Sequence, residues 1–202
     1  MQEYRKNLDA LSSAVLRAYL DSVMFLIIVP IANDKRKTSN FLFDYSYYSI
    51  RERAIIAAKS LIEPQGKNKL TLERVIKDLQ QNDKYKQYAD AMYSRYKKLF
   101  DSEEAKRVKR FRDSLCHNIK EDDNINIYCD DILMLIDDVM KILADIYQRI
   151  FNIKNENFYK IQNISKILAD DYWGAICEQA DRMPNRHKEL TELQKLLNCE
   201  LK

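Results

Sequence analysis

The sequence predicts an all-α fold, an antiparallel bundle of helices, on three observations. Glycine and proline are scarce, with 2 Gly and 3 Pro in 202 residues, whereas hairpins and phosphate-cradling loops need glycine for positive φ angles. Long stretches are rich in Leu, Ile, Lys, Glu and Ala, which favour helix. Apolar residues recur at intervals of three and four, as the buried face of a helix requires. These observations argue against a β-rich or doubly wound α/β fold.

Prolines and helix caps set the expected boundaries. The expected helices cover residues 3–29, 45–61, 72–79, 83–99, 101–117, 130–150, 158–180 and 187–197. Pro30 and Pro64 are expected to end the first two, because proline lacks the N–H that continues a helix. Thr71 is a favourable N-cap for the third. Asp101 with Glu104 three residues later has the pattern of a capping box, so the long basic helix either restarts there or continues with a kink.

The length suits one main domain. We expect a helical bundle over residues 1–155 and a C-terminal helical extension, residues 156–202, packed on the same domain. The 4 cysteines are widely spaced without a CxxC pair, which is typical of reduced thiols rather than of a zinc ribbon or a disulfide framework. The most apolar run, residues 23–31, is far shorter than the roughly 20 residues of a spanning helix. We therefore expect a cytoplasmic protein with no membrane contact.

The charge changes sign along the chain. Residues 84–112 contain ten Lys or Arg and four acids, whereas residues 121–145 contain eight acids and one Lys. The net charge of +3 hides this polarity. Two interpretations are open: a basic and an acidic helix that attract each other, or a track of cations that holds the phosphates of a polyanion.

His117, one of 2 histidines in the chain, stands between these two segments. At about 100° per residue on a helix, His117 shares a polar face with Asp113 and Arg110, opposite the apolar Phe111. Asp113 is one turn before His117, so its carboxylate can accept a hydrogen bond from the imidazole and raise the histidine pKa. A histidine that titrates near neutrality can act as a general acid or base.

Arg112 stands five residues before His117, about 140° around the helix. The two side chains cannot converge on one phosphate if the helix stays regular and the chain acts alone. Either the helix unwinds just before His117, or a second subunit supplies the partner groups.

The stretch Arg-Asp-Ser-Leu-Cys-His at residues 112–117 resembles the signature of the HEPN superfamily. In that signature an Arg is followed by a polar residue, three further residues and a His, at the end of a helix in a small all-helical protein. Asp113 matches the polar position, and Cys116 is small where many members carry Ala. The order of helices over roughly residues 5–150 is also similar to that of the abortive-infection, AbiU-like branch.

The resemblance implies an HEPN-like helical bundle with extra C-terminal helices and a metal-independent endoribonuclease of the toxin or phage-defence kind. It implies a homodimer whose two motifs line one cleft, with no cofactor and no metal. His117 would assist attack by the ribose 2′-OH or protonate the leaving oxygen, Arg112 would stabilise charge on the phosphoryl oxygens, and Asp113 would orient one of them. The basic residues expected to bind RNA are Lys106, Lys109, Arg110 and Lys120.

An antitoxin or a nucleotidyltransferase is a further partner to be expected of such a toxin. The alternative hypothesis is a non-catalytic HEPN-like protein that binds RNA or a nucleotide, or acts as a scaffold. A third is a helical protein whose motif match is accidental. Tyr45, Tyr47 and Tyr48 can stack on bases, although a packing role is favoured, and Trp173 is interpreted as a mark of a dimer or partner contact.

Overall fold

The computed structural model describes residues 2–35, 41–64, 70–117, 129–154 and 156–182, and all statements below concern these ranges. For some of them, including residues 114–117, only the backbone is described. Within these ranges the chain forms seven α-helices and no strand, so the predicted all-α class is confirmed. The helices are α1 (Gln2–Lys35), α2 (Phe41–Ile62), α3 (Leu72–Gln80), α4 (Lys86–Phe100), α5 (Glu103–His117), α6 (Cys129–Phe151) and α7 (Glu156–Arg182).

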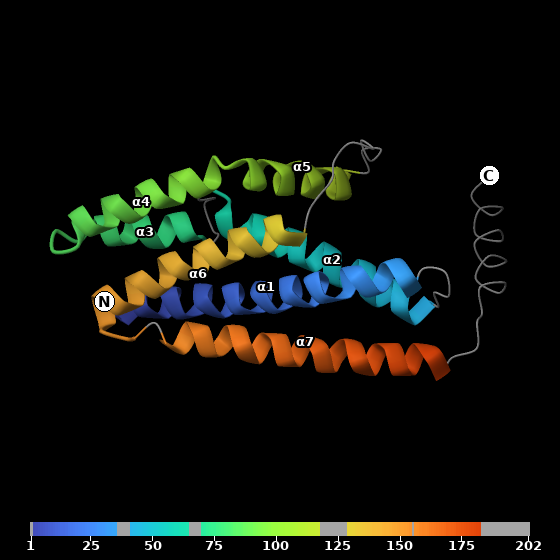
Figure 1. Ribbon diagram of the computed structural model, residues 1–202. Helices are drawn as coiled ribbons and strands as arrows, with labels where there is room; N and C mark the ends of the chain where they lie inside the picture. The colour runs from blue at the N-terminus through green and yellow to red at the C-terminus, as the bar shows by residue number, and fades with distance from the viewer. Residues whose placement is uncertain (1, 36–40, 65–69, 118–128, 155, 183–202) are drawn as a thin grey trace.

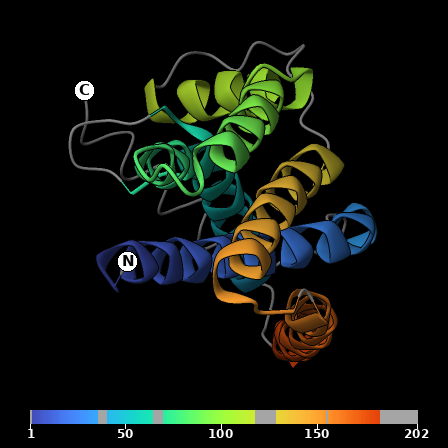
Figure 2. The same ribbon diagram turned by 90° about the vertical axis from the view of Figure 1, so that its left-hand side faces the viewer.

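Helix α1 is the central element of the bundle. It packs against α2, α6 and α7, and in Figure 1 it runs between α7 on one side and α2 and α6 on the other. Helices α3 and α4 pack against each other, and α5 packs on α2. Seen end-on in Figure 2, α4 and α5 lie on the far side of the bundle from α7. The helix that carries residues 112–117 is therefore remote from α7.

Helix α1 continues through Pro30 to Lys35, so the expected end at Pro30 is wrong. A proline inside a helix removes one backbone hydrogen bond and costs about 3 kcal/mol, which the packing of α1 onto three other helices can offset. By length and composition alone, Gln2–Val29 could cross a membrane. Its stripe of Leu8, Leu11 and Val15 is buried in the core. A helix buried in the core of a helical bundle has the same length and apolar composition as a membrane-spanning helix.

The caps show where local sequence decides the fold. Thr71 Oγ1 accepts a hydrogen bond from the Arg74 N–H at 3.3 Å, which confirms the predicted N-cap of α3. The basic helix does restart, but the capping residue is Ser102, whose Oγ accepts from the Ala105 N–H at 3.2 Å. The prediction of Asp101 as the cap is wrong, because Asp101 instead closes α4 by donating its N–H to the Lys97 carbonyl.

Trp173 on α7 belongs to the core. Its indole Nε1–H donates to the carbonyl oxygen of Met24 on α1 at 2.7 Å, and its ring packs edge-on against Tyr172. The interpretation of Trp173 as a partner contact is therefore wrong, since the side chain is fully buried within the chain. The division at residue 155 stays a prediction, and the expected helix over 187–197 lies outside the described residues.

Candidate functional site

Helix α5 presents the two faces that the sequence predicted. Val108 and Phe111 are buried, whereas Lys106, Lys109 and Arg110 are exposed. The Ser102 cap and the acidic first turn, Glu103 and Glu104, favour a helix start at this point. Residues 112–117 form the carboxyl end of this helix.

The backbone of α5 is helical up to and including His117. Local unwinding just before His117, one of the two ways to bring Arg112 and His117 together, is therefore excluded. Positions 112 and 117 then stand about 140° apart around the helix axis. Only the other alternative remains for a site that uses both residues, a contribution from a second chain.

The Arg112 guanidinium is held by two carboxylates. Its Nη2 lies 2.6 Å from Glu63 Oε1, and its Nε lies 3.2 Å from Asp113 Oδ1. The side chain is 25% exposed. Glu63 directly follows α2, so this contact ties the motif to another helix. Among the residues that the structure describes, no hydrogen-bond partner meets the Nη1 group.

Lys59 is the buried member of a group of charges beside Arg112. It is 4% exposed, and its Nζ lies 3.3 Å from Glu63 Oε1. Burial lowers the pKa of the Lys59 ammonium, Glu63 opposes this, and the cations Arg112 and Lys109 lower the pKa further. The Glu63 carboxylate thus contacts two cations, Lys59 and Arg112. We call the group Lys59, Glu63, Arg112 and Asp113 the Arg112 cluster.

The sequence analysis missed Lys59 and Glu63. The available signal was their i, i+4 spacing at the end of α2, which allows an ion pair on one helix face. Such pairs are common on exposed helices, and nothing local indicated that this one would be buried against α5.

The predicted contact between Asp113 and His117 is not among the described features, because the His117 side chain lies outside them. The Asp113 carboxylate contacts Arg112 instead. Lys120 also falls outside the described ranges. Of the other predicted RNA-binding residues, Lys106 is paired with Glu103 at 2.7 Å, while Lys109 and Arg110 are exposed near the motif.

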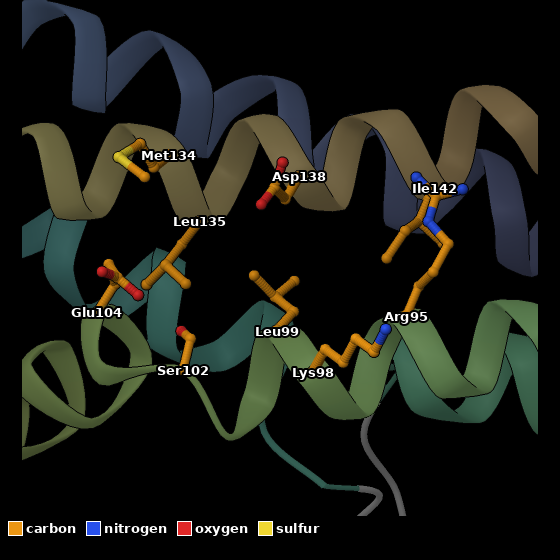
Figure 3. Close-up of a pocket in the computed structure, with 9 residues that line it drawn as sticks. All are labelled: Arg95, Lys98, Leu99, Ser102, Glu104, Met134, Leu135, Asp138 and Ile142. Atoms are coloured by element: carbon orange, nitrogen blue, oxygen red, sulfur yellow. The ribbon is translucent and has the colours of Figure 1, made fainter.

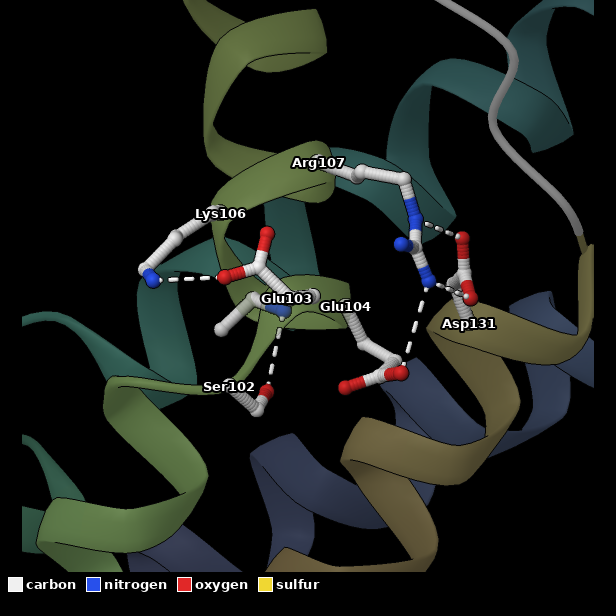
Figure 4. Close-up of polar contacts among 7 residues, drawn as sticks. Ser102, Glu103, Glu104, Lys106, Arg107 and Asp131 are labelled. Atoms are coloured by element: carbon white, nitrogen blue, oxygen red, sulfur yellow. Dashed lines mark hydrogen bonds and ion pairs between the residues drawn. The ribbon is translucent and has the colours of Figure 1, made fainter.

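Two cations of the basic segment, Arg107 and Arg95, pair with carboxylates of the acidic helix α6. Arg107 binds both carboxylate oxygens of the buried Asp131 on α6, at 2.9 and 2.8 Å, and also contacts Glu104 at 3.4 Å (Figure 4). The hydrogen bond to Asp131 raises the Arg107 pKa above its ordinary value. Arg95 on α4 pairs with Asp145 of α6 in the same way. These two residues are therefore not part of a phosphate track.

A hollow of about 280 Å³ lies between α4 and α6 (Figure 3). Apolar side chains of Leu99, Leu135 and Ile142 line it, and its cations Arg95 and Lys98 are matched by two acids, Glu104 and Asp138. None of the residues of the Arg112 cluster lines it. A small, charge-balanced hollow of this kind indicates no particular ligand, and we assign it no function.

The described residues contain no group of three or more His, Cys, Asp or Glu side chains that could hold a metal ion. The expectation that the chain needs no metal or cofactor stays a prediction. No family model matches the chain, and no curated protein or solved structure matches it either.

Proposed function

We propose that this chain is a HEPN-type endoribonuclease, a toxin or phage-defence effector, that cleaves RNA by attack of a ribose 2′-OH on the adjacent phosphate without a metal ion. The observation that carries the proposal is the Arg112 cluster. It fixes the first residue of the motif, half-buried, near the end of a helix that reaches His117.

In this reaction the 2′-oxygen loses its proton to a base and bonds to phosphorus, and the 5′-oxygen leaves and takes up a proton. The products are a 2′,3′-cyclic phosphate and a 5′-hydroxyl. His117 is the proposed group for one of the two proton transfers. The Nη1 edge of Arg112 is the proposed donor to the phosphoryl oxygens, and because Glu63 and Asp113 already orient the guanidinium, little reorganisation is needed as charge develops.

Helix geometry supports a dimeric site. Because α5 stays helical to His117, positions 112 and 117 stand on different sides of the helix in one chain. We propose a homodimer in which Arg112 of one chain and His117 of the other act on the same phosphate. A single chain with one nearby histidine offers only one proton carrier, whereas two motifs in one cleft offer two.

The charges around the motif also support an anionic substrate. The cluster with its neighbour Lys109 holds three cations and two carboxylates. The excess is positive, and the exposed Lys109 and Arg110 extend it along α5. These two residues are the proposed contacts to the RNA backbone, and an antitoxin or nucleotidyltransferase remains a predicted partner.

The direct test is cleavage of a labelled RNA in EDTA by the wild type, Arg112→Ala and His117→Ala. We expect cleavage by the wild type and loss in both variants, with Arg17→Ala, an exposed arginine on α1, as the matched control. Mixed subunits of the two inactive variants should regain activity, because one site then holds an intact Arg112 and an intact His117. Equal cleavage by wild type and both variants would refute the site.

A non-catalytic HEPN-like protein is the second candidate, because ion pairs to two carboxylates are also how a purely structural arginine is held. In that case the chain would bind RNA, a nucleotide or a partner without releasing products. Binding to RNA with no cyclic phosphate formed, at any protein concentration, would favour this candidate.

A further inference from the structure

Two tyrosines are exposed on α2. Tyr45 is 63% exposed and Tyr48 is 48% exposed, whereas their neighbour Tyr47 is buried against Phe25 with ring centroids 5.9 Å apart. The ring of Tyr48 is held edge-on against Tyr47 at 5.3 Å. The packing role favoured for these tyrosines therefore holds for Tyr47, and Tyr45 and Tyr48 present their rings to solvent.

Both exposed tyrosines stand on the face of α2 that holds Arg112. Tyr45 and Glu63 are 18 residues apart, which is five full turns of helix, and Tyr48 and Lys59 are 11 residues apart and differ by about 20°. Lys59 and Glu63 belong to the Arg112 cluster. The tyrosines therefore lie on the same side of α2 as Lys59 and Glu63, at a different position along the helix axis.

The motif runs toward these tyrosines. Helix α5 packs on α2, and in Figure 1 the two helices run in opposite directions and diverge toward the end of α5, which is level with the middle of α2. The Arg51 guanidinium lies 4.6 Å from the centre of the Phe111 ring, so the turn of α2 that follows Tyr48 contacts the residue before Arg112. Tyr48 is about 16 Å from Lys59 along α2, and α5 rises about 8 Å from Arg112 to His117 in the opposite direction.

We propose that Tyr45 and Tyr48 form a stacking platform for unpaired bases of a single-stranded RNA whose backbone lies along α5. This inference rests on the proposed function, because the platform would serve the strand that the motif cleaves. Aromatic rings beside a cationic track are the usual means of binding single strands without reading a sequence. Here the cations are Lys109 and Arg110.

The distribution of charge decides which part of the strand lies where. Glu52, exposed on the same face of α2 one turn beyond Tyr48, repels phosphates but not the faces of bases. Its neighbours Arg51 and Arg53 are engaged, Arg51 over the Phe111 ring and Arg53 with Asp21. Lys109 and Arg110 on α5 are exposed. Bases are therefore expected on α2 and phosphates on α5, which places the scissile phosphate at the end of α5 and the flanking bases on the two rings.

Binding to an RNA that cannot be cleaved tests the platform separately from catalysis. The probe is a fluorescent single strand of about ten 2′-O-methyl nucleotides, titrated with the full wild-type chain. Tyr48→Leu, which keeps an apolar side chain but removes the ring, should weaken binding by about tenfold, and Tyr45→Leu should weaken it similarly. Tyr48→Phe should bind within about twofold of wild type, because it keeps the ring.

Ile56→Ala is the matched control, since Ile56 is an exposed apolar residue on the same face of α2 and should bind as wild type. A strand of the same length without bases should bind weakly, and Tyr48→Leu should weaken it no further. Wild-type affinity of Tyr48→Leu would overturn the platform, as would an equal loss with the base-free strand. If Tyr48→Leu and Ile56→Ala both lower the molar mass in solution, the face joins two protein chains and the proposal is wrong.

The outcome is distinguishable from that of the proposed function. Loss of binding in the tyrosine variants with no cleavage by wild type would keep the platform and remove the nuclease. Cleavage that depends on Arg112 with unchanged binding by the tyrosine variants would keep the nuclease and remove the platform.

Discussion

Arg107 and Arg112 stand five residues apart on α5 and are held in different ways. Arg107 grips both oxygens of the buried Asp131 and takes a third contact from Glu104, so its donors are directed at α6. Arg112 takes one oxygen from each of two carboxylates, and one of these is shared with the buried Lys59. The first arrangement fastens one helix to another. The second holds the guanidinium through Nη2 and Nε, and no described residue meets its Nη1 group, which is the proposed donor to a phosphate.

Replacing each arginine in turn is the most direct test of whether Arg107 and Arg112 have different roles. Arg112→Ala should lower RNA cleavage by at least about 100-fold, because a fixed donor to the phosphoryl oxygens is lost. Arg107→Ala should keep cleavage within a few-fold of wild type. Initial rates in EDTA measure both. Equal losses in the two variants would mean that the whole helix, and not Arg112, is what the reaction needs.

Glu63 tests whether orientation of Arg112 matters. Glu63→Gln keeps the shape but removes the charge that faces both Arg112 and Lys59. We expect kcat to fall about tenfold with little change in KM, since the guanidinium is less well oriented in the transition state. The measurement is steady-state cleavage, with circular dichroism to verify folding. A rise in KM at constant kcat would show that Glu63 affects only binding.

Asp131 tests the other arginine. Asp131→Asn should lower the Tm by several degrees, because the bidentate ion pair that joins α5 to the start of α6 is lost from a buried site. Cleavage at a temperature well below the Tm should not change. Thermal unfolding and the RNA assay on the same sample check this. A large loss of cleavage without loss of stability would contradict a purely structural role.

The smallest expected effect is the pH dependence that Lys59 of the Arg112 cluster contributes to stability. Burial lowers the Lys59 pKa below its ordinary value of 10.5, so between the two values the unfolded chain binds more protons than the native protein. Lys59 should therefore contribute a rise in the free energy of unfolding with pH through this window. From about pH 10 upward, the buried tyrosines contribute a fall, because burial raises the pKa of Tyr4, Tyr88, Tyr96 and Tyr147. Lys59→Met should lack this rise. Denaturant titrations of both proteins at several pH values measure it.

The sequence predicted what depends on neighbours along the chain. The Thr71 cap and the buried face of α5 follow from residues within one or two turns. Asp101 failed as a cap because α4 extends to it and the next helix starts one residue later, where Ser102 accepts from the Ala105 N–H. Pro30 failed as a stop because packing of α1 overrides a local preference.

The candidate site was only half predictable. Arg112, Asp113 and the exposed cations follow from the motif and the helical period. Glu63 is 49 residues from Arg112 in the chain, and its contact depends on how α2 crosses α5, which no local pattern specifies. The sequence therefore indicated Arg112 and its neighbour Asp113 and missed Lys59 and Glu63, which complete the cluster from α2 and the residue after it.

The hydrogen bond from Trp173 to the Met24 carbonyl joins the first long helix to the last one across 149 residues. Trp173 is also the single tryptophan of the chain, so tryptophan fluorescence reports on the surroundings of this one buried side chain, where α7 packs on α1. A red shift of its emission at lower denaturant than the loss of helical dichroism would reveal α7 leaving an otherwise folded bundle. Coincident transitions would show that all seven helices unfold as one cooperative unit.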